Sequence, residues 1–329
     1  MSPSIGKADR AVRVRKSSTA QFPASIRSLL VPLDGSPFAE QALPWAAEIA
    51  RASRARLRLA LVHQVPSPPP LDEISSRLYT KIELALRKSE REYLRTTAER
   101  LRGEHEVQIA RVMLQGAPAP ALAEYVRDIG VDLVVMTTHG LGGIRRAWLG
   151  SVADRLVRSL EVPMLLIRPR EETTPGEAPP VREILVALDG SRRAESVLAP
   201  AAALARVWGA RLVLLQVVHP FVLTTRPPTV FPMGFDEELS RLARQEAQDY
   251  LDGIVEQLAE GGVDASSAAV LGSRAFDAIQ DAARAPGTGM IALATHGRGG
   301  VRRLVLGSVA DKLVRGGELP VLVTRPRSR

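Results

Sequence analysis

The feature that most constrains the fold of this chain is an internal repeat. Residues 138–157 read THGLGGIRRAWLGSVADRLV, and residues 295–314 read THGRGGVRRLVLGSVADKLV. A second match joins SLLVPLDGS at 28–36 to EILVALDGS at 183–191. A chain of 329 residues that repeats itself in this way is expected to fold as two domains of one design.

The matching positions set the limits of the two copies. Asp34 and Asp189 lie 155 positions apart, and Gly150 and Gly307 lie 157 apart, so the copies differ by a net two residues between these points. The segment EETTPGEAPPV between the copies is rich in residues that bury no apolar area, which indicates a linker. We therefore expect a disordered basic tail, a first domain, a linker and a second domain, at 1–26, 27–169, 170–182 and 183–326.

Composition limits the chemistry that the chain can perform. It has no cysteine, which excludes disulfides, thiolate metal sites and cysteine nucleophiles and fits a cytoplasmic protein. No apolar run reaches the ~18 residues of a membrane span, and the basic N-terminal segment lacks the apolar core of a secretory signal. The net charge of +8 favours polyanionic partners. A solvated, arginine-rich surface explains the same charge, because the arginines are spread among Glu and Asp.

Short apolar runs alternate with amphipathic segments in each copy. The first copy has five runs that indicate buried strands, at 29–33, 55–65, 107–116, 132–138 and 163–169. Ser36 and Pro37 predict the start of the first helix, Pro44 predicts a kink in it, and a long charged helix is expected at about 71–102. Strands that alternate with helices predict a parallel sheet covered on both faces.

The residues with unusual chemistry follow the strands. Asp34-Gly35-Ser36 comes after the first strand, a glycine-rich loop begins at His139, and Gly150-Ser151 opens the next helix. Ligands of open parallel sheets lie beyond the carboxyl ends of the strands. Glycines allow a ligand to approach the main chain, and the unpaired amides of a helix start favour a phosphate group. The same loops carry two pairs of arginines, Arg145, Arg146, Arg302 and Arg303.

Each of these residues also has a purely structural explanation. Ser151 with Asp154 fits a helix capping box, and Asp34 fits a turn former after a strand. His139 fits a loop residue that donates to the backbone. The second copy offers the same alternatives at Ser308, Asp311, Asp189 and His296. The chain has no P-loop, nucleophile elbow or kinase signature.

These motifs resemble those of the universal stress protein family. The family's phosphate-loop pattern is G-x-x-G, nine residues and then G-[ST]. The chain matches it twice from the second glycine onward, at Gly140, Gly150 and Ser151 and at Gly297, Gly307 and Ser308. The first glycine of the pattern is replaced by Thr137 and by Ala294. The family's aspartate after the first strand matches Asp34 and Asp189. The resemblance covers almost the whole chain outside the tail and the linker.

The resemblance implies a fold, a ligand and a site. The fold is a flavodoxin-like, adenine-nucleotide alpha-hydrolase-like α/β domain in each copy, with a five-stranded parallel sheet between helices. The ligand is ATP, held between the aspartate and the Gly-Ser helix start, and a valine of the second strand touches adenine. Whether Mg²⁺ accompanies the ATP phosphates stays open. The implied site residues are Pro32, Asp34, Gly35, Val62, Thr137, Gly140, Gly143, Gly150, Ser151 and Val152 in the first copy and Asp189, Gly190, Val217, Ala294, Gly297, Gly300, Gly307, Ser308 and Val309 in the second.

The family often pairs domains through the last strand. The segments MLLIRP and VLVTRP are therefore expected to pair antiparallel within the chain, which makes an internal pseudo-dimer and removes two exposed sheet edges. A further homodimer stays open. An unidentified regulatory protein partner is also expected, on a surface made by the long segments 64–102 and 218–261.

Three functions remain possible from the sequence. The first is an ATP-binding regulator of stress or dormancy with little or no catalysis, because no general base is evident. The second is a slow Mg²⁺-dependent ATPase or phosphotransfer enzyme in which Asp34 or His139 takes part. The third is a basic scaffold for nucleic acid or acidic partners, whose binding would depend steeply on salt.

Overall fold

The computed structural model describes residues 25–64, 73–138, 149–169, 178–220, 222–223, 234–295 and 306–326. The first half contains the predicted alternation of strands and helices: β1 (Ser28–Leu33), α1 (Pro37–Glu40), α2 (Leu43–Ser53), β2 (Arg56–His63), α3 (Glu73–Glu104), β3 (Gln108–Gln115), α4 (Pro118–Ile129), β4 (Leu133–Thr137), α5 (Ser151–Ser159) and β5 (Met164–Ile167). The described residues of the second half repeat this order, with a 3₁₀ helix in place of α1, and also include the two-stranded ribbon β8-β9: β6 (Glu183–Leu188), the 3₁₀ helix η1 (Ala194–Val197), α6 (Leu198–Trp208), β7 (Arg211–Val218), β8 (Val222–Leu223), β9 (Gly234–Phe235), α7 (Glu237–Glu260), β10 (Ala265–Leu271), α8 (Ala275–Ala283), β11 (Thr288–Ala294), α9 (Ser308–Gly316) and β12 (Val321–Thr324).

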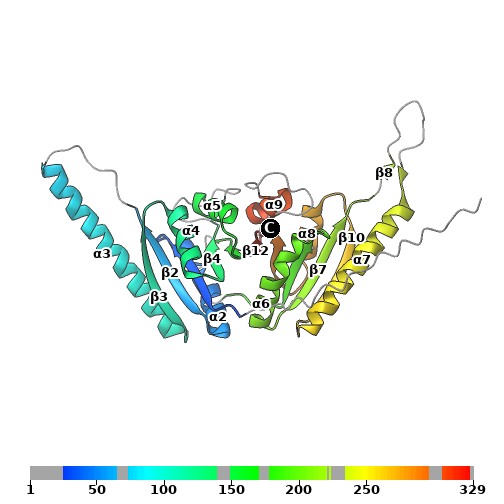
Figure 1. Cartoon of the computed structure of the whole chain (residues 1–329), viewed down its shortest axis with the longest axis horizontal. Helices are drawn as coiled ribbons and strands as arrows, with labels where there is room; N and C mark the ends of the chain where they lie inside the picture. Colours follow the sequence, from blue (N-terminus) through cyan, green and yellow to red (C-terminus); the bar gives the residue numbers. More distant parts are fainter. Residues whose placement is uncertain are drawn as a thin grey trace, which may run out of the picture.

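Both halves contribute to one ten-stranded sheet, in the order β10-β7-β6-β11-β12-β5-β4-β1-β2-β3. Within each half the five strands are parallel, as the sequence predicts. The halves are joined by β5 and β12, which pair antiparallel with Leu165 opposite Leu322. The predicted pairing of the two last strands is therefore present. Figure 1 shows this joint at the centre of the molecule.

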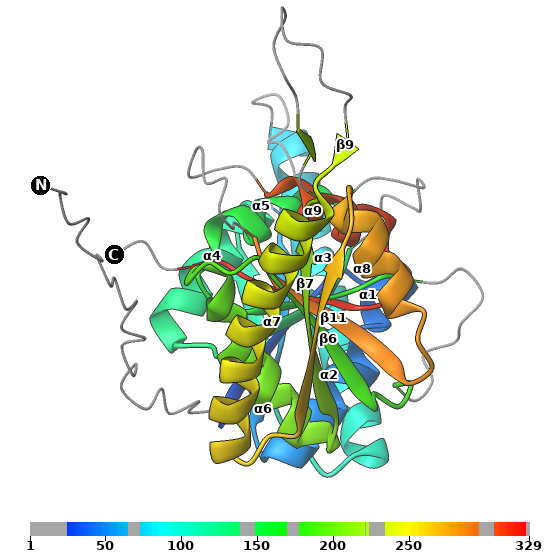
Figure 2. The ribbon, with the colours of Figure 1, turned by 90° about the vertical axis from the view of Figure 1, so that its right-hand side faces the viewer.

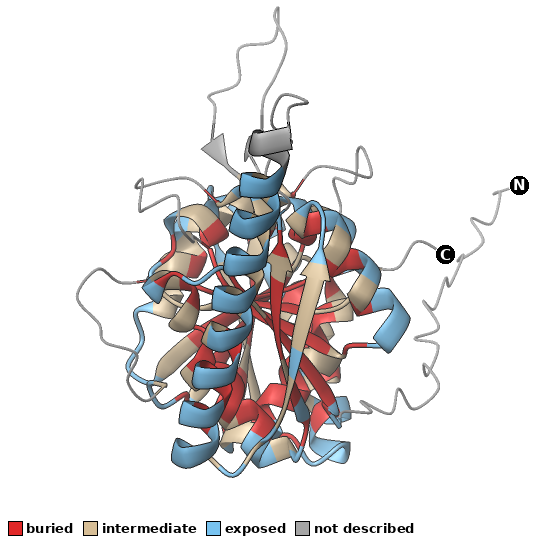
Figure 3. Ribbon diagram, turned by 90° about the vertical axis from the view of Figure 1, so that its left-hand side faces the viewer, coloured by how far each residue is buried: buried red, intermediate tan, exposed pale blue. Residues whose placement is uncertain are grey.

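Helices cover both faces of the sheet because strand side chains alternate between them. In β1, Leu29 and Val31 belong to the core under α2, α3, α6 and α7, whereas Leu30 belongs to the core under α4, α5, α8 and α9. Both cores contain residues of both halves, so each core runs through the joint. The helices lie over the faces of the sheet (Figure 2). The inner strands are mostly buried and the outer faces of the helices are exposed, whereas the edge strands β3 and β10 are only partly buried (Figure 3).

The first helical segment differs from its prediction in one respect. Ser36 is the N-cap, as predicted, and its Oγ accepts a hydrogen bond from the Ala39 amide at 3.1 Å. The expected kinked helix, however, is two helices, α1 and α2, separated by a turn at Gln41 and Ala42. Pro44 explains the break, because proline has no N–H to continue a helix but fits the first turn of a new one.

Side chains reinforce the joint between the halves. The rings of Trp45 on α2 and Trp208 on α6 meet edge to face, with centroids 6.1 Å apart. Arg168 donates to the carbonyls of Arg315 and Gly317 at the end of α9, at 3.3 and 2.8 Å. Arg325 makes the equivalent contact to the carbonyl of Arg158 at the end of α5. Arginines at helix C-termini satisfy the last carbonyls and complement the helix dipole.

Of the helices that the structure describes, none has both the length and the apolar character that crossing a membrane requires.

Candidate functional site

The predicted site residues follow strands that are neighbours in the sheet. β1 lies between β2 and β4, and β6 lies between β7 and β11. The strands that follow β1 along the chain are therefore added first on one side of it and then on the other, and the same holds for β6. Ligand sites of open parallel sheets lie at such reversals of strand order, beyond the carboxyl ends of the strands. Each half thus has one such edge, at the top in Figure 1.

The aspartate after the first strand of each half shapes its own turn. Asp34 Oδ1 accepts hydrogen bonds from the Ser36 amide at 2.9 Å and from Ser36 Oγ at 2.6 Å. Asp189 Oδ1 accepts one from the Ser191 amide at 3.0 Å. The turn-forming explanation is therefore part of what these residues do. Asp34 is exposed at the carboxyl edge, and Asp189 is half-exposed.

The backbone conformation between the aspartate and the serine requires glycine in both halves. Gly35 has φ 82° and Gly190 has φ 78°, in the left-handed region that residues with a Cβ avoid. The Asp-Gly-Ser turn therefore has the same shape in both halves, although the element that follows is an α-helix in one and a 3₁₀ helix in the other.

The Gly-Ser helix starts are tied to the ends of the preceding strands. The Gly150 amide donates to the Thr138 carbonyl at 2.8 Å, and the Gly307 amide donates to the Thr295 carbonyl at 2.7 Å. A Cβ at position 307 would lie 2.7 Å from the same Thr295 oxygen, so the close approach explains the glycine. Sequence reasoning did not assign a role to Thr138 and Thr295, although each opens a copy of the long repeat.

The capping-box alternative is wrong. Gly150 and Gly307 are the N-caps of α5 and α9, and neither makes a side-chain cap hydrogen bond. A capping box needs serine at the N-cap and the acidic residue three positions later. Here Ser151 is already the first helical residue, so Asp154 lies one position too far along the helix. Ser151 and Ser308 are exposed at the carboxyl edge.

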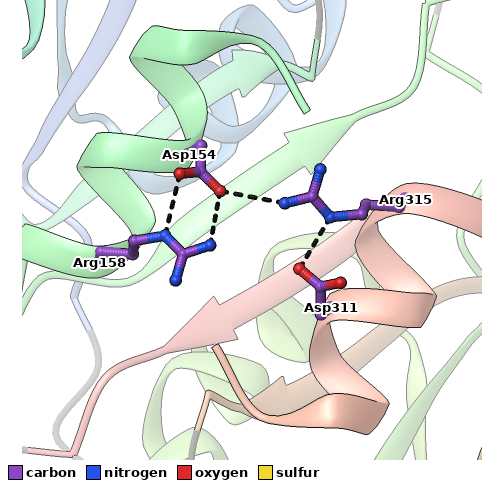
Figure 4. Close-up of polar contacts among 4 residues, drawn as sticks. All are labelled: Asp154, Arg158, Asp311 and Arg315. Atoms are coloured by element: carbon purple, nitrogen blue, oxygen red, sulfur yellow. Dashed lines mark hydrogen bonds and ion pairs between the residues drawn. The ribbon is translucent and has the colours of Figure 1, made fainter. Parts of the chain in front are cut away.

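The carboxylate of Asp154 instead belongs to an ion cluster between the two halves (Figure 4). Arg158 donates to both carboxylate oxygens of Asp154, each at 2.9 Å. Arg315 of the other half donates to Asp154 at 3.2 Å and to Asp311 at 2.8 Å. Hydrogen bonds and charge from Arg158, with a contribution from Arg315, lower the pKa of Asp154. The two helices that begin at the Gly-Ser motifs are thereby linked by their first and last turns.

The other predicted residues are distributed along the same edge. Val62 and Val217 are half-buried at equivalent places in β2 and β7, on the side of the sheet that faces α4 and α8. The remaining described members lie at strand ends or in the first turns of α5 and α9: Pro32, Thr137, Val152, Ala294 and Val309. Six glycines and histidines, together with the arginine pairs, lie outside the described residues: Gly140, Gly143, Gly297, Gly300, His139, His296, Arg145, Arg146, Arg302 and Arg303.

Within the described ranges, no group of three or more His, Asp or Glu side chains has the arrangement that would hold a metal ion.

The comparisons with known proteins all point to the same family. The model of the universal stress protein family matches the chain twice, at residues 25–168 and 180–325. The universal stress protein Rv1996 of Mycobacterium tuberculosis is 29% identical over 319 residues, which cover 90% of this chain and 94% of that protein. The universal stress protein Rv2005c of the same organism is 25% identical over 318 residues, with 92% and 98% covered.

Among solved structures, a universal stress protein from Archaeoglobus fulgidus superposes with a TM-score of 0.65 and 16% identity, over 91% of this chain and 98% of that one. At this identity the likeness concerns the fold alone.

Proposed function

The chain belongs to the universal stress protein family, and from that premise we propose that each half binds one ATP molecule at its carboxyl edge. The observation that carries the proposal is the repetition of one arrangement in both halves. An Asp-Gly-Ser turn and an amide-rich helix start follow neighbouring strands at the reversal of strand order. The proposed domains are 27–169 and 183–326, joined by the linker 170–182.

The start of α5 fits a phosphate group. Because Gly150 has no side chain, no capping group of its own competes for the first amides of the helix. Those amides and the helix dipole favour an anion. The nearby carboxylate of Asp154 does not oppose it, since Arg158 and Arg315 neutralise that charge. The same reasoning applies to α9, where Arg315 pairs with Asp311.

The nucleoside would occupy the other side of the edge. Asp34 and Asp189 would accept hydrogen bonds from ribose hydroxyls, and Val62 and Val217 would contact adenine. Mg²⁺ would enter as part of the Mg–ATP complex and would not be held by the protein in the absence of nucleotide. The glycines of the two loops, Gly140, Gly143, Gly297 and Gly300, complete the proposed site.

We infer that binding, and not turnover, is the function. Asp34 Oδ1 holds the turn through Ser36, and in the proposed arrangement this carboxylate meets the ribose and not the phosphates, where a general base would have to act. The protein would then act as a cytoplasmic regulator of the stress response, in which bound ATP controls contact with another protein.

Equilibrium dialysis with labelled ATP tests this proposal. We expect saturable binding of two equivalents per chain and turnover too slow to deplete the ligand. Asp34→Ala and Asp189→Ala should each remove or weaken one equivalent. Asp128→Ala, an exposed aspartate of α4, should leave both unchanged. Circular dichroism checks that the variants are folded.

The opposing outcomes are distinct. Absence of saturable binding by the wild type contradicts the proposal. Multiple turnover that Asp34→Ala or His139→Ala abolishes, with binding retained, would support the enzymatic alternative. Polyanion binding that ATP does not displace and that weakens steeply as salt is added would support the hypothesis of a basic scaffold.

A further inference from the structure

The two long helices α3 and α7 occupy equivalent places at opposite ends of the molecule (Figure 1). Each lies beside an edge strand of the sheet, β3 or β10. Tyr93 on α3 donates to Glu40 at 3.0 Å, and Tyr250 on α7 donates to Glu195 at 3.1 Å. The matched tyrosines are 157 positions apart, so the two helices can be compared residue by residue.

This comparison shows opposite charges. The sequence of α3 has eight basic and six acidic residues, a formal charge of +2. The sequence of α7 has two basic and seven acidic residues, a formal charge of −5. Arg91 and Arg95 of α3 correspond to Gln248 and Asp252 of α7. Opposite formal charges of this kind favour contact between the two ends when they belong to different copies.

The basic end contains a groove of about 600 Å³ between α3 and β3. It is lined by Glu83, Leu84, Arg87, Lys88, Arg91, Glu92, Arg95 and Arg111. Arg87 and Arg95 are paired with glutamates of α3 itself. The other three cations, Lys88, Arg91 and Arg111, form no ion pair with any residue that the structure describes. The groove lining holds five cations and two carboxylates, so its formal net charge is +3 (5 − 2).

Apolar side chains accompany the charge at both ends. Leu84 in the groove is 63% exposed, and Ile82 beside it is 47% exposed. On α7, Leu239 occupies the position equivalent to Ile82 and is 42% exposed, and Leu242 is 49% exposed one turn later. Exposed apolar patches that are rimmed by polar or charged residues are typical of contact surfaces. Figure 3 shows the exposed outer face of α3.

We propose that the α3 groove receives helix α7 of a second copy of this chain. Acidic residues of α7 that make no ion pair within the described residues, Glu246 and Glu256 among them, would face Lys88, Arg91 and Arg111. Leu239 and Leu242 would pack against Ile82 and Leu84. Because the two surfaces lie at opposite ends of the molecule, each contact leaves one α3 and one α7 available. The assembly is therefore head to tail and closes only as a ring. It does not depend on ATP binding.

Sedimentation velocity of the full chain tests the proposal. The wild type should exceed the 35.5 kDa of one chain as concentration rises, and added salt should reverse the association. Two variants should each remain at the mass of one chain: Arg91→Glu with Arg111→Glu, and Leu239→Glu with Leu242→Glu. Arg127→Glu with Arg284→Glu changes the net charge by the same amount as the arginine variant, but outside α3, β3 and α7, and should associate like the wild type.

Mixing the two non-associating variants distinguishes head-to-tail contact from a symmetric dimer. Each retains one intact surface, so the mixture should form a species of twice the chain mass and stop there. A mixture that remains at the mass of one chain overturns the proposal, as does a wild type that is monomeric at all concentrations. A wild type that is monomeric but binds an oligonucleotide through Arg91 and Arg111 would assign the groove to nucleic acid instead.

Discussion

The two halves of the molecule are nearly identical at the carboxyl edge and different at the outer ends. At the edge, each half has the same aspartate turn, the same glycine at positive φ and the same bond from a helix-start glycine to a strand-end threonine. At the outer ends, a basic helix of 32 residues stands opposite an acidic one of 24 residues. These turns and hydrogen bonds are repeated in both halves because few other residues can adopt their backbone geometry. Exposed helix faces carry no such requirement, so their charges differ.

A second difference lies inside the protein. His63 at the end of β2 is 1% exposed and its Nδ1 lies 2.7 Å from Glu90 Oε2 on α3. Val218 and Ala247 occupy the equivalent places in the second half. The amides of Gly116 and Gly272, which donate to the carbonyls of His63 and Val218, confirm that equivalence. One fold therefore tolerates either a buried histidine paired with a half-buried glutamate or an apolar pair at this contact.

The largest expected effect tests whether the halves share one core. Leu165→Ala and Leu322→Ala remove fully buried side chains on either side of the joint. Each should lower the free energy of unfolding by ~2–5 kcal/mol, because each leaves a cavity in the continuous core. Urea unfolding followed by circular dichroism measures the loss. A two-step transition in which only the mutated half unfolds would show that the halves are independent.

The second prediction replaces the His63–Glu90 pair by the apolar residues that the second half has at the same places. Glu90→Ala should cost ~1–3 kcal/mol, because it leaves the buried His63 ring without its partner. Adding His63→Val reproduces the second half and should recover most of that loss. Urea unfolding of the single and double variants decides the matter. No recovery in the double variant would mean that the pair does more than fill the contact.

The helix-start glycine should tolerate no side chain. Gly307→Ala should cost ~1–3 kcal/mol, since the new Cβ would lie 2.7 Å from the Thr295 carbonyl oxygen. Gly253→Ala in α7 is the matched control, because its Cβ would meet nothing within 4 Å. The control should be neutral or stabilise by up to ~1 kcal/mol. Equal melting temperatures for both variants would contradict the packing explanation.

The ion cluster predicts a smaller, pH-dependent difference. Asp154→Asn should cost about 1 kcal/mol, and Asp311→Asn less, because Asp154 binds two arginines and Asp311 one. The Asp154 pKa is lowered in the folded protein. Its contribution is therefore complete above the unfolded-state pKa of about 4 and declines as the pH falls through the folded value. The difference in unfolding free energy between the wild type and Asp154→Asn should therefore be largest at neutral pH and shrink at acidic pH. A difference that is the same at both pH values would contradict this.

The sequence predicts the fold well and the details of the site less well. Strand and helix order follow from periodicity, and the expected long helix at about 71–102 is observed at Glu73–Glu104. The capping box was wrong because sequence spacing does not reveal which residue becomes the N-cap. The Asp154–Arg315 bond joins residues 161 positions apart, so no local pattern indicates it. The roles of Thr138 and Thr295 depend on main-chain carbonyls, which sequence does not display.

The central claim is that each half holds a nucleotide at its Gly-Ser helix start. The most direct test is a crystal structure grown with a non-hydrolysable ATP analogue and Mg²⁺. The account predicts phosphate density at the first amides of α5 and α9, with the nucleoside beside Asp34 and Asp189. Two helix starts filled by the chain's own side chains, with no space for a triphosphate in either half, would contradict it.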